Sequence, residues 1–284
     1  MSDLFPRTTV AGVSLPRLII GSNWFAGCSH RSVAADTMIQ NHLDAPEKIA
    51  DILEVFLNNG VDAIMALLYA QTNIRKAVEI AEGRTNKRMI VIDTPGINVD
   101  DNPTARKEAE AVIKQCAKED RATFCLIHHT SCEALVSKNK KTIDRLPDYL
   151  AMIRDAGMIP GLSAHMPEII QYTDANEYDV ETYIQLYNCL GFLMQVEVEL
   201  VNKIIWSAKK PVMTIKPMAA GRCTPFVGLN FSFATLRDCD MVTLGVMSKL
   251  EAVEDIEIAR AALEHRKADI KARNSVAKTS LQQD

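Results

Sequence analysis

The sequence predicts a (β/α)8 TIM barrel, and three observations support this prediction. Short apolar segments of strand length alternate with longer amphipathic segments of helix length, and this alternation repeats eight times. The chain has 284 residues, which is long enough for one such barrel. The segment "GSNWFAGCSH" after the first strand lacks the G-x-G-x-x-G pattern of a doubly wound dinucleotide-binding sheet. We therefore expect a single barrel over residues 1–270 and a polar tail at 271–284.

Each predicted strand is a short apolar run that ends in polar or turn-forming residues. "RLIIGSN" is the first such run, "VIDTPG" ends the third, and "FCLIHH" forms most of the fourth. In chain order, the predicted strands are residues 17–23, 61–67, 88–96, 122–129, 158–165, 180–188, 211–222 and 239–246.

Each predicted helix follows one of these strands. In the first, "DAPEKIADILEVFLNNG", we expect Asp44 to cap the amino terminus and Gly60 to end the helix. In chain order, the predicted helices are residues 44–60, 72–83, 104–120, 143–157, 166–176, 198–210, 229–238 and 249–272.

Composition narrows the classes of partner. The net charge of −4 and the pI of about 5.9 argue against nucleic acid and anionic membranes, which favours a small-molecule substrate. No apolar run reaches the roughly 18 residues of a membrane-spanning helix, and the amino terminus lacks an apolar signal core, so we expect a cytoplasmic protein. The seven cysteines are scattered without a C-x-x-C pair, which indicates reduced thiols.

The carboxyl ends of the strands are where barrels of this class place their active sites. Each strand end of this chain offers polar or aromatic side chains. In strand order they are Asn23, Trp24 and His30; Tyr69; Asp93; His128 and His129; Ser163 and His165; Gln185, Tyr187 and Asn188; Lys216 and Arg222; and Ser248 and Lys249.

Two adjacent histidines end the fourth strand. Neighbouring residues of a strand point to opposite faces, so we expect only one of them to face the barrel mouth. His128 is the expected catalytic group, and His129 is expected to support it, the substrate or a nearby loop. The alternative is a histidine that fills the barrel and bonds to a neighbour.

Asp93, His128 and His165 form a candidate metal or acid–base site. One carboxylate and two imidazoles on successive strands would suit Zn, Mn or Fe. The alternatives are structural, since Asp93 can serve a turn and His165 can cap the following helix.

Lys216 is the candidate for binding a negative group or for catalysis. It can hold a substrate carboxylate or phosphate, form a Schiff base, or pair with Glu197 or Glu199. The other candidate substrate-binding residues are Asn23, His30, His129, Asn188 and Arg222.

From the fourth strand onward the chain resembles the aldo/keto reductase superfamily. "CLIHH" is similar to the family segment in which a histidine follows "LxLIH", and "AGMIPGLSAHMPEII" resembles "GKIRAIGVSNFSPE". "IQLYN" is similar to "QxxYN", and "VTLGVMSKLEAVEDI" resembles the turn and helix that hold the cofactor's phosphate. The resemblance covers about half of the chain and implies the same barrel fold.

The resemblance also implies roles for individual residues. The family uses a tetrad of Asp, Tyr, Lys and His, and His128 matches the histidine. Met65 stands where the aspartate would be, Tyr69 falls one place short of the tyrosine, and "VIDTPG" offers no lysine. The resemblance implies NADPH as cofactor, with Ser248 and Lys249 near its phosphate.

Three functions remain open from the sequence. The first is an enzyme that acts on a small sugar-like, carboxylated or phosphorylated compound by metal- or histidine-assisted lyase, isomerase or hydrolase chemistry. The second is an NADPH-dependent carbonyl reductase in which His128 and Tyr69 polarise the carbonyl. The third is a binding barrel without catalysis.

Overall fold

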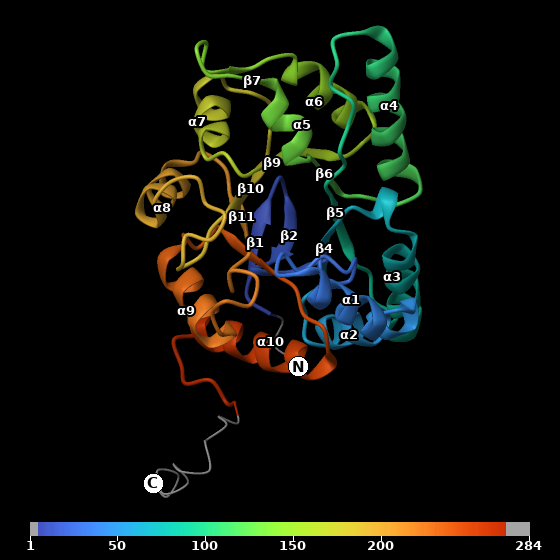
Figure 1. Ribbon diagram of the computed structural model, residues 1–284, viewed down its shortest axis with the longest axis vertical. Helices are drawn as coiled ribbons and strands as arrows, with labels where there is room; N and C mark the ends of the chain where they lie inside the picture. Colours follow the sequence, from blue (N-terminus) through green and yellow to red (C-terminus); the bar gives the residue numbers. More distant parts are fainter. Residues whose placement is uncertain (1–4, 271–284) are drawn as a thin grey trace, which may run out of the picture.

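A closed barrel of eight parallel strands forms the centre of the molecule (Figure 1). The computed structural model describes residues 5–270. Val242 pairs with Leu18, so the last strand closes on the first and the predicted barrel is confirmed. In barrel order the strands are β3 (Leu18–Gly21), β4 (Ala63–Ala66), β5 (Ile90–Asp93), β6 (Phe124–Ile127), β9 (Ile159–Ala164), β10 (Thr182–Leu186), β11 (Val212–Ile215) and β12 (Met241–Leu244).

Helices surround this barrel and follow the predicted order. They are α2 (Pro46–Asn58), α3 (Thr72–Thr85), α4 (Pro103–Lys118), α6 (Leu146–Asp155), α7 (Glu168–Ala175), α8 (Val198–Ser207), α9 (Pro225–Thr235) and α10 (Lys249–Leu263). None of the helices within residues 5–270 has the length and apolarity to cross a membrane.

Some predicted helix boundaries are wrong; α9, for example, begins at Pro225 and not at residue 229. Asp44 does not cap α2, because Ala45 holds the cap position and Asp44 instead pairs with Lys48 at 2.8 Å. Proline at the first turn of α2 fixes the backbone there without a side-chain cap. The last helix ends at Leu263, and the predicted tail at 271–284 lies outside the described residues.

Several short elements were not predicted. The hairpin of β1 (Arg7–Val10) and β2 (Val13–Pro16) turns at Ala11 and Gly12, both with positive φ, and packs Val10 and Leu15 against the interior of the barrel. The connections also contain α1 (Val33–His42), η1 (Leu68–Ala70), α5 (His129–Cys132), η2 (Glu133–Leu135), β7 (Val136–Ser137) and β8 (Thr142–Ile143).

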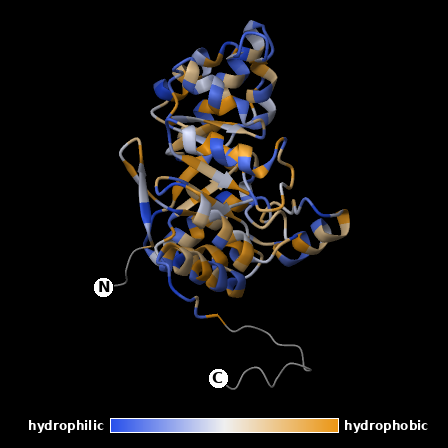
Figure 2. Cartoon of the chain, turned by 90° about the vertical axis from the view of Figure 1, so that its left-hand side faces the viewer, coloured by the Kyte–Doolittle hydropathy of each residue, from blue (hydrophilic) through white to orange (hydrophobic). Residues whose placement is uncertain are grey.

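The barrel strands divide their side chains between two apolar cores. Ile92, Phe124 and Met213 belong to the cluster inside the barrel, whereas Val91 and Cys125 belong to the layer between strands and helices. This alternation follows from the two-residue period of a strand. Figure 2 shows the resulting pattern, with hydrophobic strands inside and hydrophilic residues on the outer helices.

Candidate functional site

One large cavity opens at the carboxyl ends of the strands. It encloses about 670 Å³, which is within the usual range for small-molecule sites. Strand ends and the loops that follow them form its walls, as expected for this barrel. The predicted residues that line it are Asn23, Trp24, His30, His128, His129, Ser163, His165, Lys216 and Arg222.

The loop after β11 brings Lys216 into this cavity. Lys216, Ala219 and Ala220 all have positive φ values, of 62°, 50° and 57°. Such a conformation costs about 1–2 kcal/mol for each residue that carries a Cβ. The loop also packs closely against α9, since a Cβ on Gly228 would lie 2.5 Å from the carbonyl oxygen of Pro217. Packing against α9 therefore holds this strained loop and fixes the base of the lysine.

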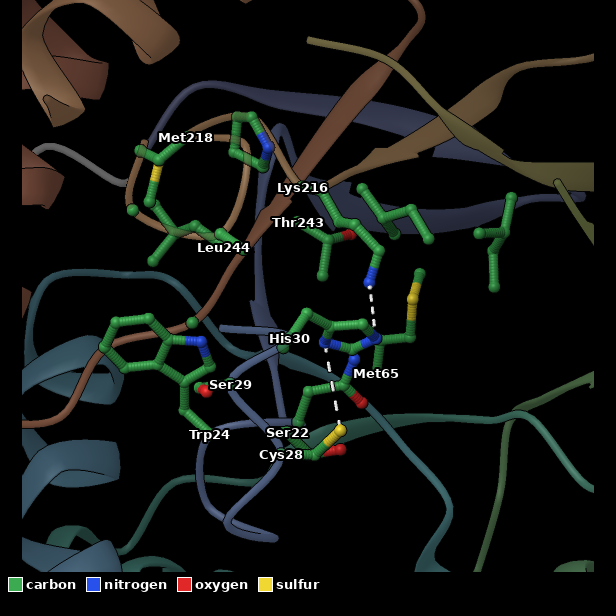
Figure 3. A pocket seen from close by; sticks show the side chains of 18 of the residues that line it. Ser22, Trp24, Cys28, Ser29, His30, Met65, Lys216, Met218, Thr243 and Leu244 are labelled. Carbon is green, nitrogen blue, oxygen red and sulfur yellow. Dashed lines mark hydrogen bonds between the residues drawn. The ribbon is translucent and has the colours of Figure 1, made fainter. Parts of the chain in front are cut away.

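Lys216 and His30 point toward one another across the mouth of the barrel (Figure 3). The Lys216 Nζ atom lies 3.2 Å from Nε2 of His30, and Nδ1 of His30 lies 3.8 Å from the Cys28 sulfur. Burial lowers the pKa of Lys216, and burial together with Lys216 lowers the pKa of His30. The geometry fits an ammonium that donates to a neutral imidazole. The alternative pairing of Lys216 with Glu197 or Glu199 is not formed, since the hydrogen-bond partner of Lys216 within residues 5–270 is His30.

Three further histidines gather in the same mouth. The rings of His128 and His129 have centroids 4.2 Å apart, and His129 stacks on His165 at 3.9 Å. Burial, followed by the neighbouring His129, lowers the pKa of both His128 and His165 to about 4. Both rings are therefore neutral near pH 7 and available as bases or as neutral donors.

The expectation that only one of the adjacent histidines faces the mouth is wrong. Both His128 and His129 line the cavity. Strand alternation ends at Ile127, because His129 already belongs to α5 and turns back toward the barrel axis. His128 accepts or donates a hydrogen bond at Nδ1 to the Thr130 hydroxyl, 2.9 Å away, which fixes its ring.

Asp93 does not join His128 and His165, so the predicted metal set is not assembled. Asp93 lies fully buried outside the barrel wall, because Ile92 takes the inward position on β5. Its carboxylate accepts from the Thr94 backbone N–H at 2.8 Å and lies in a cluster with Cys116 and Asp120. Burial, followed by Asp120, raises the pKa of Asp93 to about 7.

Glu133 is the carboxylate that the structure places beside the histidines, and no sequence pattern pointed to it. One of its oxygens accepts from the backbone N–H groups of His165 at 2.6 Å and Met166 at 3.0 Å. Potential ligand atoms of His129, Glu133 and His165 lie within 4.8 Å of one another. Glu133 therefore orders the turn after β9, and this trio offers the ligand types that divalent transition metals favour.

Two other predicted residues do not line the cavity. Tyr69 belongs to η1, and its hydroxyl lies 3.6 Å from the position that a Cβ on Gly96 would occupy. Asn188 is fully buried and bonds to the backbone of Leu190 and Phe192, so it shapes the loop after β10. The predicted substrate role of Asn188 is therefore replaced by a structural one.

Arg222 and Asn23 stand at the exposed rim of the cavity. The Arg222 guanidinium carbon lies 3.8 Å from the centroid of the Phe192 ring, and its Nη1 donates to the Ala219 carbonyl. This stacking keeps the guanidinium over the cavity. The rim position fits the predicted contact with a negatively charged substrate.

The far end of the cavity is built by α10. Ser248 caps this helix, and Lys249 pairs with Asp51 at 3.3 Å; neither residue lines the cavity. Glu251 and Asp255, two acidic residues one turn apart, line it instead. Burial, followed by Glu251 and Glu254, raises the pKa of Asp255 to about 7.

Comparison with known proteins shows the fold. A putative aldo-keto reductase from Pseudomonas aeruginosa matches with a TM-score of 0.65 and 13% identity, over 93% of this chain and 98% of that one. A glycerol dehydrogenase from Gluconobacter oxydans matches with a TM-score of 0.61 and 12% identity, over 95% and 98%. An aldo-keto reductase from Klebsiella pneumoniae, in complex with NADPH, matches with a TM-score of 0.60 and 13% identity, over 93% and 92%.

Sequence comparison adds nothing to this likeness. No protein-family model matches the chain, and no curated protein matches it by sequence. At the identities above, the structural matches speak for the fold alone. The chain therefore has the same closed (β/α)8 barrel fold as these aldo-keto reductases.

Proposed function

We propose that this protein is an enzyme that reduces the carbonyl group of a small, negatively charged compound with a nicotinamide cofactor. The observation that carries the proposal is the contact of 3.2 Å between Lys216 and His30 in the mouth of the barrel. Solved structures with the same fold are described as reductases and a dehydrogenase, and one holds NADPH.

Lys216 takes the role of proton donor in this proposal. The tyrosine and lysine of the family tetrad have no counterpart in the cavity, and Met65 lines it where the aspartate would be. Lys216 supplies a cation whose pKa burial has lowered, which brings it closer to the value that suits a proton donor near neutral pH. In this mechanism the proton donor therefore lies after β11, and not on β4 or β5 as in the family tetrad.

The cavity wall carries polar groups that suit an extended ligand. Ser163 on β9, Thr243 on β12 and Asp255 on α10 all line the cavity, and within residues 5–270 the buried hydroxyl of Thr243 has no hydrogen-bond partner. A buried polar group without a partner is costly unless a ligand or water supplies one. These three groups and the strand-end glycine Gly21 would hold a nicotinamide dinucleotide along the cavity.

The chemistry divides between the cofactor and Lys216. A nicotinamide cofactor, when bound, supplies a hydride to the carbonyl carbon. The carbonyl electron pair then moves to the oxygen, which takes a proton from the Lys216 ammonium. His30 accepts a second hydrogen of the same ammonium at Nε2 and so orients it. Arg222 at the rim binds the substrate's carboxylate or phosphate.

Turnover of small 2-oxo acids and aldehydes with NADH or NADPH tests the proposal. Lys216→Met should lower kcat/KM by about 100-fold or more, because the proton donor is lost. Lys216→Arg should keep much of the binding but not the rate, because guanidinium does not release its proton. Lys203→Met, which removes an exposed lysine on α8, is the control. Full turnover by Lys216→Met would contradict the proposal.

A second candidate rests on the histidine cluster. His128 and His165 are neutral imidazoles in contact with His129, which favours metal- or histidine-assisted isomerase, lyase or hydrolase chemistry without a nicotinamide. His129, Glu133 and His165 are the residues that would hold Zn, Mn or Fe. They take the place of the set that includes Asp93.

Three measurements separate the candidates. Incorporation of solvent deuterium beside the carbonyl of a 2-oxo acid, without any nicotinamide, would favour the second. Near-stoichiometric metal in protein prepared without a histidine tag, lost in His129→Ala, would favour its metal-dependent form. Reduction that transfers deuterium from deuterated NADH or NADPH to the product would favour carbonyl reduction.

A further inference from the structure

The α10 end of the cavity differs from a phosphate site in both its charge and its free donors. We infer that it binds the hydroxyl groups of an unphosphorylated ribose, so that the dinucleotide this barrel accepts is NAD(H) and not NADP(H). The inference rests on the proposed function and specifies which nicotinamide cofactor binds. It depends on Glu251 and Asp255, which sequence reasoning did not select.

Side chains at the start of α10 already bind backbone N–H groups at the amino end of this helix. The Ser248 hydroxyl accepts from the Glu251 N–H at 3.2 Å, and the Glu251 carboxylate accepts from the Met247 N–H at 2.6 Å. This arrangement resembles a capping box, with the N–H before the cap in place of that of the cap, and it uses two of the backbone donors at the start of the helix. A carboxylate of the chain thus stands where the family resemblance implies a phosphate.

The cation expected at this position points elsewhere. Lys249 is exposed, its Nζ lies 3.3 Å from an Asp51 oxygen, and it does not line the cavity. Asp51 is also bound by Arg84 at 2.9 Å, so the pair belongs to a surface network between α2, α3 and α10. A phosphate at the α10 end would meet Glu251 and Asp255 without a compensating lysine.

Asp255 supplies the positive evidence for a hydroxyl ligand. Its side chain is 3% exposed, lines the cavity and has no hydrogen-bond partner within residues 5–270. Glu251 lines the same end, so a second carboxylate there repels anions. A carboxylate in this setting is matched by hydrogen-bond donors of a ligand, and acidic side chains bind ribose hydroxyls in NAD sites of other folds. A ribose without a 2′-phosphate offers such donors, whereas a phosphate offers further negative charge.

Calorimetric titration of the full-length protein with NADH and with NADPH tests the inference. The wild type should bind NADH at least about tenfold more tightly than NADPH, since an acidic pair faces the extra phosphate. Asp255→Asn should weaken NADH binding about tenfold and narrow the ratio between the two cofactors, because a charged acceptor is lost. Thermal unfolding of each variant verifies that it is folded.

Glu254→Gln is the matched control. It removes the same charge from the same helix, but Glu254 is exposed and does not line the cavity. The ratio of the two affinities should stay unchanged in this variant. An equal change in Glu254→Gln and Asp255→Asn would assign the effect to general charge and overturn the contact.

The other outcomes are equally decisive. Equal or tighter binding of NADPH to the wild type overturns the inference but leaves carbonyl reduction as the proposed function. Binding of neither dinucleotide overturns the inference and carbonyl reduction together, and leaves the histidine-assisted candidate.

Discussion

Asp93 and Asp255 are two buried aspartates with the same raised pKa of about 7 and different surroundings. Asp93 is enclosed between β5 and the outer helices, with a backbone N–H and the carboxyl of Asp120 as neighbours. Asp255 opens onto the cavity and has no partner within residues 5–270. A raised pKa alone therefore does not identify a functional group, because burial raises it in both places. Access to the cavity is what separates the two.

Asp93→Asn should give the largest change in stability. The folded pKa of about 7 lies above the ordinary 3.8, so the stabilising effect of the protonated form is complete below about pH 4 and is lost as pH rises through about 7. Asparagine keeps the acceptor for Thr94 but never ionises. The variant should gain up to about 4 kcal/mol over the wild type at about pH 8, and much less at about pH 5.

Urea unfolding at the two pH values measures this difference. Asp155→Asn, at an exposed aspartate of α6, is the control and should show no such pH dependence. A loss of stability in Asp93→Asn at about pH 8 would mean that the carboxylate is better solvated than its burial indicates.

Arg75→Met tests how much the cation beside the buried carboxylates of Asp120 and Asp93 contributes to stability. Arg75 lies 2.6 Å from the fully buried carboxylate of Asp120, which in turn faces Asp93. Removing the cation should cost about 3 kcal/mol at neutral pH, since it leaves a buried charge without its partner. Arg106→Met, which breaks an exposed pair with Asp148, should cost less than about 1 kcal/mol. Equal costs in urea unfolding would refute the distinction.

Asp255→Asn should raise stability less than Asp93→Asn does. Its pKa is raised in the same direction, so its stabilising effect is likewise lost as pH rises from about 4 to about 7. Water in the cavity solvates part of the charge, so we expect a gain of about 2 kcal/mol at about pH 8. If the gain matched that of Asp93→Asn, the two carboxylates would be equally enclosed.

The histidines should show the opposite dependence on pH. Burial lowers the pKa of His128 to about 4, below the ordinary 6.5. Its contribution to stability is therefore complete above about pH 6.5 and is lost as pH falls toward 4. When the pH falls from about 7 to about 4, His128→Gln should lose about 1 kcal/mol less unfolding free energy than the wild type. This value allows for solvent screening at the open mouth. An NMR titration of the imidazole that gave an ordinary pKa would contradict this expectation.

The sequence by itself determined the barrel and most of its mouth. Eight alternating apolar segments require eight strand–helix units, and parallel strands bring their carboxyl ends to one rim. Lys216, His128 and His165 follow strands directly, and Arg222 lies in the loop after β11, so their meeting at the cavity could be expected from the order of elements.

Only the tertiary structure decided which polar groups face the cavity. Asp93 turned outward because Ile92 fills the inward position, while His129 turned inward because α5 begins there. Glu133 and Asp255 lie on helices, and Lys216 meets His30 across 186 positions of the chain. The local pattern fixes the period of each element, but the phase of that period against the barrel axis depends on packing with the rest of the chain.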